Sequence, residues 1–339
     1  MLALVRYGYN ENDIEMRNIP EPSPAYGEVK IEVKAVGICG TDLIGRPGLQ
    51  LPVVIGHELS GDIVEVGEGV RTRKIGDRVT CDTTAYICGE CRFCLAGDYN
   101  LCIERRSIAS RANGAFAKYM VIREGSAFLL PDNVSYSSGS ICELLACAIH
   151  FVTEQALINE SELVLVLGPG PAGLLVMQVA IANGARVVVG GTSVDNNRLK
   201  LSKQLGAYRT INVEKENIME IIKSITNGYG ADVVIECTGN AKAVSIALGC
   251  VRRKGKYVQV GITHSKIPLD FDDIFYVREI SMIGGHGSKP SSWIKALDLL
   301  KLGIVNVEPL ITCELPLLRW EEGFQMMKEK KAIKVVLHP

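Results

Sequence analysis

The pattern of apolar and polar positions changes near Phe151. Before this point, short segments such as residues 29–36 and 62–66 alternate apolar and polar side chains with a period of two, and glycine and proline separate them. This alternation is typical of strands that bury one face. The N-terminal part of the chain is therefore predicted to be rich in β-structure.

Beyond Phe151, short apolar runs alternate with segments of helical periodicity. Strands are predicted at residues 163–167, 186–190, 232–236 and 256–260, and helices near residues 172–183, 197–205 and 241–250. Strands that alternate with helices indicate a parallel, doubly wound sheet, so the predicted fold class is α/β. Two more helices are predicted at residues 291–301 and 320–330, before a last strand at residues 334–337.

Length and charge narrow the possible functions. A chain of 339 residues is long enough for two domains. Lys and Arg number 37 against 38 Asp and Glu, with no basic block, so neither nucleic acid nor an anionic membrane is expected as a partner. No apolar stretch reaches the ~18 residues of a spanning helix. The expected partner is a small molecule.

Eleven cysteines, and an N-terminus without a secretory leader, favour a reducing compartment, which we expect to be the cytoplasm. Four of the cysteines form a C-x₂-C-x₂-C-x₇-C run: Cys88, Cys91, Cys94 and Cys102. Four thiolates close the coordination shell of one zinc ion, which leaves no position for substrate. The alternatives are four unrelated buried thiols or an iron–sulfur cluster, although the familiar ferredoxin spacings differ. We therefore predict a structural zinc site.

A glycine-rich turn follows the predicted strand at residues 163–167. It reads Gly168, Pro169, Gly170, Pro171, Ala172 and Gly173, which is a G-x-G-x-x-G pattern at the start of a helix. The glycines allow a tight turn, close approach of the backbone to a pyrophosphate, and close helix packing. The helix N-terminus then offers N–H groups to the phosphates. The alternative is a turn that merely needs glycine.

The end of the next strand bears on the choice of coenzyme. An acid that binds a ribose 2′-hydroxyl is expected about twenty residues after the turn, but Gly191 and Thr192 stand there. Thr192 and Ser193, with Arg198 nearby, could instead bind a 2′-phosphate, although Arg198 could equally be a solvated helix charge. Asp195 lies late for the acid role. The sequence therefore favours NADP over NAD and leaves both open.

Residues with metal-binding chemistry also occur outside the cysteine run. Cys39 and His57 supply two of the three protein ligands that an open zinc site requires. Glu143 lies in an apolar stretch, where an ionised carboxylate needs a cation, so it is the expected third ligand or its water-bridged substitute. Taken singly, Cys39 and His57 could be core residues, and Glu143 a capping or solvated residue. Together they predict a reactive metal site.

With these motifs in this order, the chain resembles the zinc-dependent medium-chain dehydrogenases/reductases of the alcohol dehydrogenase superfamily, in the branch of polyol and threonine dehydrogenases. The resemblance covers essentially the whole length. Its motifs are residues 37–42, 56–58, the cysteine run, residues 143–145, the glycine-rich turn, residues 236–239 and residues 308–312.

The resemblance implies two domains. A GroES-like catalytic domain is expected at residues 1–147, with a structural zinc lobe at about residues 81–106. A Rossmann domain that binds NAD(P) is expected at residues 148–287, and residues 288–339 would complete the catalytic domain. The active site would lie between the two domains.

The same resemblance implies roles for single residues. Cys39 and His57 would hold the catalytic zinc, and Glu58 would lie beside the metal as a ligand or exchange partner. Glu143 occupies a position that is cysteine in many alcohol dehydrogenases and a carboxylate in polyol dehydrogenases. The nicotinamide end would be contacted by residues that follow later Rossmann strands: Thr238, Gly239, Val260, Gly284, Gly285 and His286.

Zinc at an open site lowers the pKa of a bound alcohol, and the substrate then transfers a hydride to the nicotinamide. Thr41 is predicted to take the hydroxyl proton, unless its hydroxyl only bonds a local backbone group. Asp42 is predicted to accept a hydrogen bond from His57, although an ordinary turn aspartate would also fit. Ile44 stands where many relatives have a relay histidine, so the proton exit is open. Ser288 stands where many polyol dehydrogenases carry an arginine.

The sequence thus predicts a zinc- and NAD(P)-dependent dehydrogenase, with two zinc ions per chain, that interconverts a secondary alcohol of a polyol or sugar with its ketone. An amino alcohol such as threonine is the alternative substrate. A non-catalytic binding or structural protein on the same fold is the alternative of another class. A homodimer or homotetramer is expected, joined through an edge strand at residues 279–283.

Overall fold

The structure is a computed structural model that describes residues 1–44 and 48–339. The chain divides into two compact units. The first comprises Met1–Ala146, Gly287–Gly303 and Val307–Pro339, and the second comprises Cys147–His286 and Ile304–Asn306. None of the helices in these described residues has the length and apolar character that crossing a bilayer requires.

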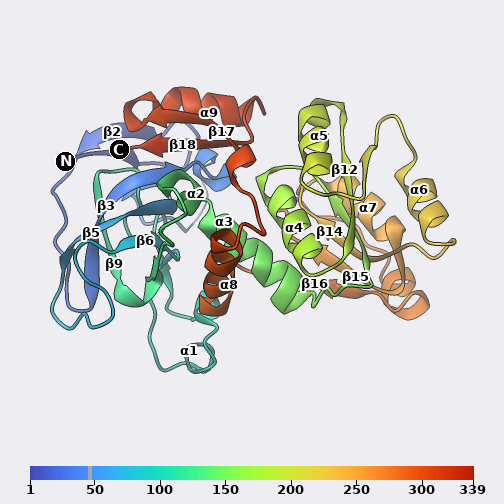
Figure 1. The fold of residues 1–339 in the computed structure, drawn as a ribbon, viewed down its shortest axis with the longest axis horizontal. Coiled ribbons are helices and arrows are strands. Elements are labelled where there is room, and N and C mark those ends of the chain that lie inside the picture. The colour runs from blue at the N-terminus through green and yellow to red at the C-terminus, as the bar shows by residue number, and fades with distance from the viewer. Residues whose placement is uncertain (45–47) are drawn as a thin grey trace. The chain divides into compact units, whose positions relative to one another are not determined.

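The first unit is built around a β-sheet with the strand order β10-β6-β5-β3-β18-β17, and β9 pairs with β3. Its strands are β3 (Glu28–Gly37), β5 (Glu58–Val66), β6 (Arg78–Cys81), β9 (Tyr119–Arg123), β10 (Ala127–Leu129), β17 (Ile311–Pro316) and β18 (Lys334–His338). The last strand, β18, is antiparallel to β3 and parallel to β17. The C-terminal segment therefore lies inside the sheet that the N-terminal residues begin (Figure 1).

Smaller elements surround this sheet. They are a second sheet of β1 (Leu2–Arg6), β2 (Ile14–Asn18) and β4 (Val53–Val54), the hairpin of β7 (Thr84–Tyr86) and β8 (Arg106–Ser107), and the helices α1 (Arg92–Leu95), α2 (Tyr136–Ser140), α3 (Cys142–Ile149), α8 (Pro290–Lys301) and α9 (Trp320–Lys328). The alternation predicted from the sequence is confirmed in β3, where Val29, Ile31 and Val33 are buried. Helix α9 ends two residues before the predicted end.

The second unit contains a parallel sheet with the order β13-β12-β11-β14-β15-β16. Its strands are β11 (Leu163–Leu167), β12 (Arg186–Gly191), β13 (Arg209–Asn212), β14 (Ala231–Glu236), β15 (Val251–Gln259) and β16 (Ser281–Ile283). Its helices are α4 (Pro171–Ala182), α5 (Asn196–Gln204), α6 (Ile218–Ile225) and α7 (Ala241–Cys250). The predicted α/β fold class with a doubly wound sheet is confirmed.

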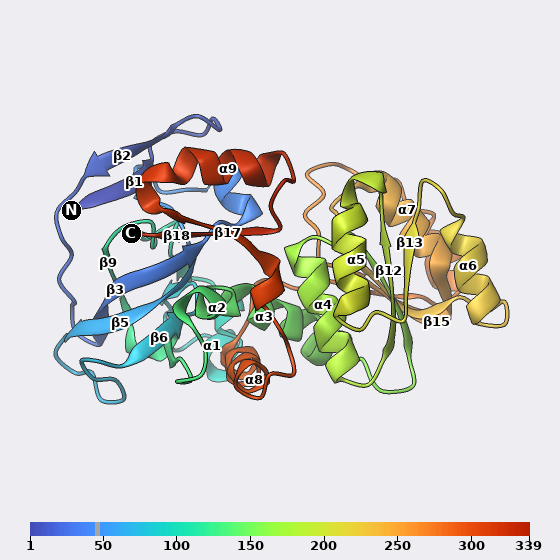
Figure 2. The ribbon, with the colours of Figure 1, turned by 45° about the horizontal axis from the view of Figure 1, so that its top comes forward.

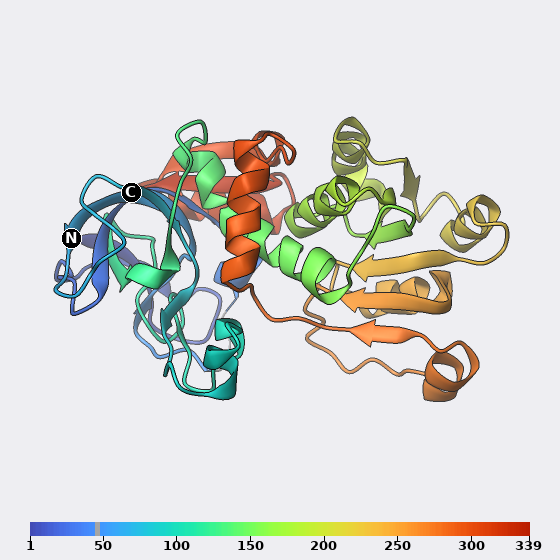
Figure 3. The ribbon, with the colours of Figure 1, turned by 60° about the horizontal axis from the view of Figure 1, so that its bottom comes forward.

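The helices cover both faces of the parallel sheet. Helices α4 and α5 lie on one face and α6 and α7 on the other (Figure 2). Because both faces are covered, every residue of the central strand β11 is buried. Strands β14, β15 and β16 run side by side in one direction, and β16 forms the edge (Figure 3). Strand β13 and helix α6 were not predicted from the sequence.

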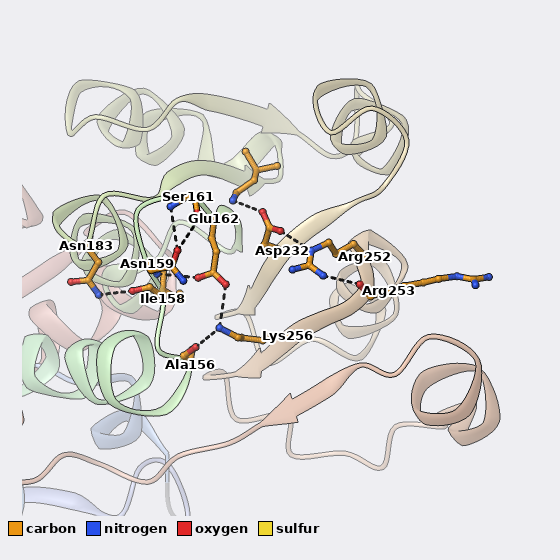
Figure 4. A network of polar contacts seen from close by, with 11 residues as sticks. Ala156, Ile158, Asn159, Ser161, Glu162, Asn183, Asp232, Arg252, Arg253 and Lys256 are labelled. Atoms are coloured by element: carbon orange, nitrogen blue, oxygen red, sulfur yellow. Dashed lines mark hydrogen bonds and ion pairs between the residues drawn. The ribbon is translucent and has the colours of Figure 1, made fainter.

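A polar network ties together the amino ends of three strands of this sheet (Figure 4). The carboxylate of Asp232 in β14 accepts hydrogen bonds from the backbone N–H of Leu163 at 2.7 Å and from Arg252 Nε at 2.6 Å. Lys256 Nζ lies 3.1 Å from Glu162 Oε1 and donates to the Ala156 carbonyl at 2.9 Å. These contacts fix the ends of β11, β14 and β15 relative to one another.

Replacing Asp232 with alanine is expected to destabilise the protein by about 1–3 kcal/mol, because the Leu163 N–H and the Arg252 guanidinium both lose their acceptor. Urea unfolding monitored by circular dichroism would measure the loss. Lys254→Gln is the matched control, since the Lys254 side chain is 74% exposed and its ion pair with Glu279 contributes little. Equal stabilities of Asp232→Ala and the parent would refute the role of this network.

Candidate metal centres and nucleotide site

The four cysteines of the predicted structural site come together. The sulfur atoms of Cys88, Cys91, Cys94 and Cys102 all lie within 4.8 Å of one another. Cys88 Sγ is 3.9 Å from Cys94 Sγ and 3.6 Å from Cys102 Sγ. Tetrahedral zinc with Zn–S bonds of about 2.3 Å requires sulfur separations of roughly 3.8 Å. The four thiols therefore fit one zinc ion.

Local structure explains how this cysteine lobe, residues 86–106, is formed. Cys91 precedes the short helix α1 (Figure 1), and β7 pairs with β8 at the two ends of the lobe, where Tyr86 lies opposite Arg106. Hydrogen bonding, chiefly from the Cys94 N–H, lowers the pKa of Cys91 to about 6, whereas burial raises the pKa of Cys94 to about 12. Holding all four sulfurs as thiolates therefore requires a cation, which zinc would supply.

A second cluster forms in the main sheet of the first unit. One possible ligand atom from each of Cys39, His57 and Glu58 lies within 4.8 Å of the others. Antiparallel pairing of β3 with β5 sets Gly37 opposite Glu58. Cys39, two residues after the end of β3, is therefore close to His57 and Glu58 at the start of β5. Gly56 adopts φ +87°, and a Cβ there would lie 2.7 Å from the Phe116 ring. Only glycine therefore fits at the position before His57.

Asp42 orients both metal-binding side chains of this cluster. Its Oδ2 accepts a hydrogen bond from the Cys39 N–H at 2.9 Å, and its Oδ1 lies 3.4 Å from His57 Nδ1. The second distance is that of a charge contact rather than a short hydrogen bond. The Thr41 hydroxyl donates to Cys39 Sγ at 3.3 Å. Arg6, also buried, donates to the Asp42 carbonyl at 3.0 Å.

The electrostatic field at the cluster favours a cation. Burial lowers the pKa of His57, but the negative charges of Asp42 and Cys39 outweigh burial and raise it well above its usual value. For Asp42, burial acts to raise the pKa, but the His57 ring and the hydrogen bond from the Cys39 N–H outweigh burial and lower the pKa below its usual value. The same negative charges would favour a divalent ion bound by the neutral His57 ring and the Cys39 thiolate.

Lys334 is the important residue that the sequence analysis missed. It is buried in β18, with Nζ 2.6 Å from Glu58 Oε1 and 2.5 Å from Glu58 Oε2, and it donates to the Ile38 carbonyl at 3.0 Å. Burial lowers its pKa, but the charges of Glu58, Cys39 and Glu143 raise it above the usual value. A lysine inside the apolar segment 332–337 was the available signal, because a buried ammonium needs a partner.

Glu143 lies apart from the three clustered ligand atoms. It is buried in the first turn of α3 and contributes to the field at Lys334, but its carboxylate does not belong to the group within 4.8 Å. Ile44 lines a small pocket with Thr41, Asp42 and His57. An apolar side chain therefore stands where a relay histidine would be, in the same pocket as Thr41.

In the second unit, the glycine-rich turn has the geometry of a pyrophosphate-binding turn. Gly168 adopts φ +95°, and a Cβ on Gly173 would lie 1.9 Å from the Gly168 carbonyl oxygen. Gly170 is the N-cap of α4, which begins at Pro171. The turn therefore requires glycine at positions 168 and 173. The first N–H groups of α4 are available to an anion.

A pocket lies next to this turn. Its lining residues come from the carboxyl ends of β11, β12, β13 and β14, from the turns that follow them and from α7: Leu167, Gly168, Gly190, Gly191, Thr192, Asp195, Val213, Thr238, Ala243 and Ile246. Gly168, Thr192 and Thr238 were predicted to contact the coenzyme, whereas Asp195 was thought too late in the sequence. Val260, Gly284, Gly285 and His286 do not line this pocket; Gly285 packs against the Phe151 ring.

Glu236 shapes the pocket without lining it. Its carboxylate is fully buried and accepts hydrogen bonds from the N–H groups of Thr238 and Gly239, at 2.7 and 3.0 Å, and from Gln259 Nε2 at 2.8 Å. Thr238 in turn packs its methyl group against Gly168. Glu236 therefore fixes the turn after β14 relative to the glycine-rich turn.

Comparison with known proteins agrees with this geometry. Residues 25–132 match the model of the alcohol dehydrogenase GroES-like domain, and residues 171–301 match the model of the zinc-binding dehydrogenases. A sorbitol dehydrogenase from Halalkalibacterium halodurans is 41% identical over 100% of this chain and 99% of its own length. A D-arabitol-phosphate dehydrogenase from Enterococcus avium is 38% identical, over 97% of this chain and 94% of its own.

A solved structure extends the comparison to three dimensions. A protein from Sinorhizobium meliloti, described as a zinc-binding dehydrogenase bound to NADP, superposes with a TM-score of 0.91 at 30% identity, over 100% of this chain and 99% of that one. Both units, both metal-binding clusters and the glycine-rich turn fall within the matched length. The chain therefore belongs to the zinc-dependent medium-chain dehydrogenases of the alcohol dehydrogenase superfamily, in the branch that contains the polyol dehydrogenases.

Proposed function

We propose that this protein oxidises a secondary alcohol of a polyol or sugar to the ketone, with NAD or NADP as the hydride acceptor. The observation that carries the proposal is the cluster of Cys39, His57 and Glu58, whose surrounding charges favour a divalent cation. The similarity to sorbitol and arabitol-phosphate dehydrogenases supports the substrate class. The nucleotide pocket at the glycine-rich turn supports the coenzyme class.

Zinc bound at this cluster would act as a Lewis acid that lowers the pKa of an alcohol hydroxyl. Cys39 and His57 would hold it, with Asp42 fixing the orientation of both ligands. Glu143 is proposed as the third ligand or its water-bridged substitute. Lys334 donates a hydrogen bond to Glu58 Oε1 and lies at ion-pair distance from Oε2, which is buried without a hydrogen-bond donor among the described residues, so Glu58 is proposed as a ligand of the zinc or as its exchange partner.

Thr41 is proposed to take the substrate proton, since its hydroxyl already lies beside Cys39 Sγ and can rotate between donor and acceptor roles. Ile44 offers no titratable group, so the proton would have to leave Thr41 through water or the coenzyme ribose. In the middle of the dinucleotide, the pyrophosphate would be held by Gly168, Gly170, Pro171, Ala172 and Gly173.

The cysteine lobe would hold the second zinc ion, which supplies folding free energy and no chemistry. Thiolate ligands of this kind persist in a reducing compartment, and this supports the cytoplasm as the location. We also propose a homodimer or homotetramer. Strand β16 is an edge of the parallel sheet, and the exposed side chains of Phe275, Tyr276 and Met282 lie on or just before it.

A substrate panel would test the function. We expect coenzyme-linked turnover of sorbitol, arabitol and their phosphates with kcat/KM about 100-fold above that for L-threonine, because a site built for several hydroxyls rejects analogues that leave its polar groups unpaired. Higher turnover of threonine would assign the amino-alcohol function instead. No turnover of any alcohol, together with about one zinc per chain, would indicate a non-catalytic protein on the same fold.

A further inference from the structure

We propose that Glu214 is a selectivity residue that makes this enzyme prefer NAD over NADP. The inference rests on the proposed function, because it concerns the coenzyme of the same reaction. It is opposite to the preference that the neutral residues Gly191 and Thr192 favour in the sequence. The reason lies in which side chains the fold places around the donors that follow β12.

These donors lie where the adenosine ribose is bound. In a Rossmann fold, the residues that follow the second strand meet the 2′ position of that ribose. Here Gly191 ends β12, Thr192 follows it, and both line the pocket at the glycine-rich turn. A Cβ on Gly191 would lie 2.9 Å from Pro169 Cγ and 3.2 Å from Asp195 Cβ. Gly191 is therefore kept free of a side chain, and neighbouring residues must select the coenzyme.

Glu214 occupies the donors of Ser193. Its Oε2 accepts a hydrogen bond from the Ser193 N–H at 3.0 Å, and Ser193 Oγ also accepts from Asn212 Nδ2 at 3.2 Å. Hydrogen bonds from the Ser193 hydroxyl and N–H lower the pKa of Glu214, so the carboxylate stays ionised. A 2′-phosphate at Ser193 would have to displace this negative charge.

Arg198, the cation that the sequence offered for a 2′-phosphate, is also paired with an acid. Arg198 Nη1 lies 3.4 Å from Asp195 Oδ1. Asp195 Oδ2 accepts hydrogen bonds from the Thr192 N–H at 3.1 Å and from Thr192 Oγ1 at 2.8 Å. Every group that the sequence offered for a 2′-phosphate thus faces a carboxylate in the folded protein.

This arrangement discriminates between the two coenzymes by charge and by hydrogen-bond type. A phosphate monoester carries a charge of about −1.5 to −2 near neutral pH and is chiefly an acceptor. The carboxylates of Glu214 and Asp195 repel it, while the Arg198 guanidinium is already paired with Asp195 and the Lys215 charge already acts on Glu214. A ribose 2′-hydroxyl is neutral and can donate to either carboxylate. Like-charge juxtaposition of this kind is a general way to exclude a competing ligand.

Glu214 is the more informative of the two acids to replace. Asp195 is buried and holds the Thr192 turn, so its loss would disturb the pocket itself. Glu214 is exposed between β13 and α6. Glu216, two residues further, has the same charge and exposure, but it pairs with Arg209 and accepts from the Asn212 N–H. It is the matched control for a general change of surface charge.

The experiment measures dissociation constants of NADH and NADPH by nicotinamide fluorescence for the parent, Glu214→Ala, Glu214→Gln and Glu216→Gln. Competition by 5′-ADP and 2′,5′-ADP isolates the adenosine end from the metal site. We expect the parent to bind NADH at least about tenfold more tightly than NADPH. Both Glu214 variants should bind NADPH and 2′,5′-ADP about tenfold more tightly, with NADH changed less than about threefold. Glu216→Gln should behave as the parent.

The outcomes separate this inference from the proposed function. A parent that prefers NADPH, Glu214 variants with an unchanged preference, or an equal shift in Glu216→Gln would each overturn the role of Glu214 and leave the dehydrogenase assignment standing. A parent that binds neither nicotinamide coenzyme would overturn the proposed function, and the inference with it.

Discussion

The Cys39→Ser variant is expected to lose turnover about a thousandfold or more while it keeps its fold. An open zinc site uses three protein ligands, and a serine hydroxyl does not replace a thiolate as a ligand. A thousandfold loss corresponds to about 4 kcal/mol of transition-state stabilisation, a reasonable value for displacing the group that polarises the substrate. The variant is nearly isosteric, and the backbone N–H of residue 39 can still bond Asp42.

Coenzyme-linked absorbance and metal analysis would check this prediction together. The parent should contain about two zinc ions per chain and the variant about one. Cys313→Ser is the matched control, because Cys313 is also a partly buried free thiol of the first unit and belongs to neither metal-binding cluster. Full activity of Cys39→Ser would show that the reaction takes place elsewhere on the protein.

Removing one ligand of the cysteine lobe is expected to lower the stability of the protein, in contrast to Cys39→Ser, which should lower turnover. In Cys91→Ser the lobe should lose its metal, and the melting temperature should fall by at least ~5 °C, because binding of a structural zinc ion contributes directly to the free energy of folding. The polypeptide from Cys88 to Cys102 contains only a four-residue helix and a single turn of 3₁₀-helix, so little else holds it together. Calorimetry would measure the shift, and limited proteolysis would locate it within the lobe.

The two cysteine variants serve as controls for each other. Cys39→Ser should melt within about 2 °C of the parent. Cys91→Ser should melt at a lower temperature although none of its substrate-binding groups has been removed. If Cys91→Ser melted like the parent and resisted protease, the lobe would hold no metal. If both variants lost stability equally, the distinction between a structural and a reactive site would be wrong.

The sequence predicted well those features that depend on residues close together in the chain. The spacing of Cys88 to Cys102 brings four thiols together within one loop, and the apolar run 163–167 forms a buried strand followed by the expected turn. The reactive cluster was also accessible, because Cys39 and His57 flank two strands that pair. The predicted helix at residues 241–250 is confirmed over its whole length.

Features that depend on distant pairing could not be predicted from local patterns. Lys334 reaches Glu58 across 276 positions, and this contact exists only because β18 lies beside β3. Glu214 reaches Ser193 only because β13 lies beside β12, and β13 itself was missed. The sequence favoured NADP from the residue types after β12 and left NAD open, and the contact of Glu214 with Ser193 becomes visible only in the folded chain.

The position of β18 also has a consequence for how the protein is made on the ribosome. Since β18 separates β3 from β17 and supplies Lys334, the sheet of the first unit cannot be completed until this late segment has been translated. Residues 147–286 emerge earlier and contain a complete parallel sheet. During synthesis the nucleotide-binding half can therefore fold first, while the catalytic half waits for its final strand.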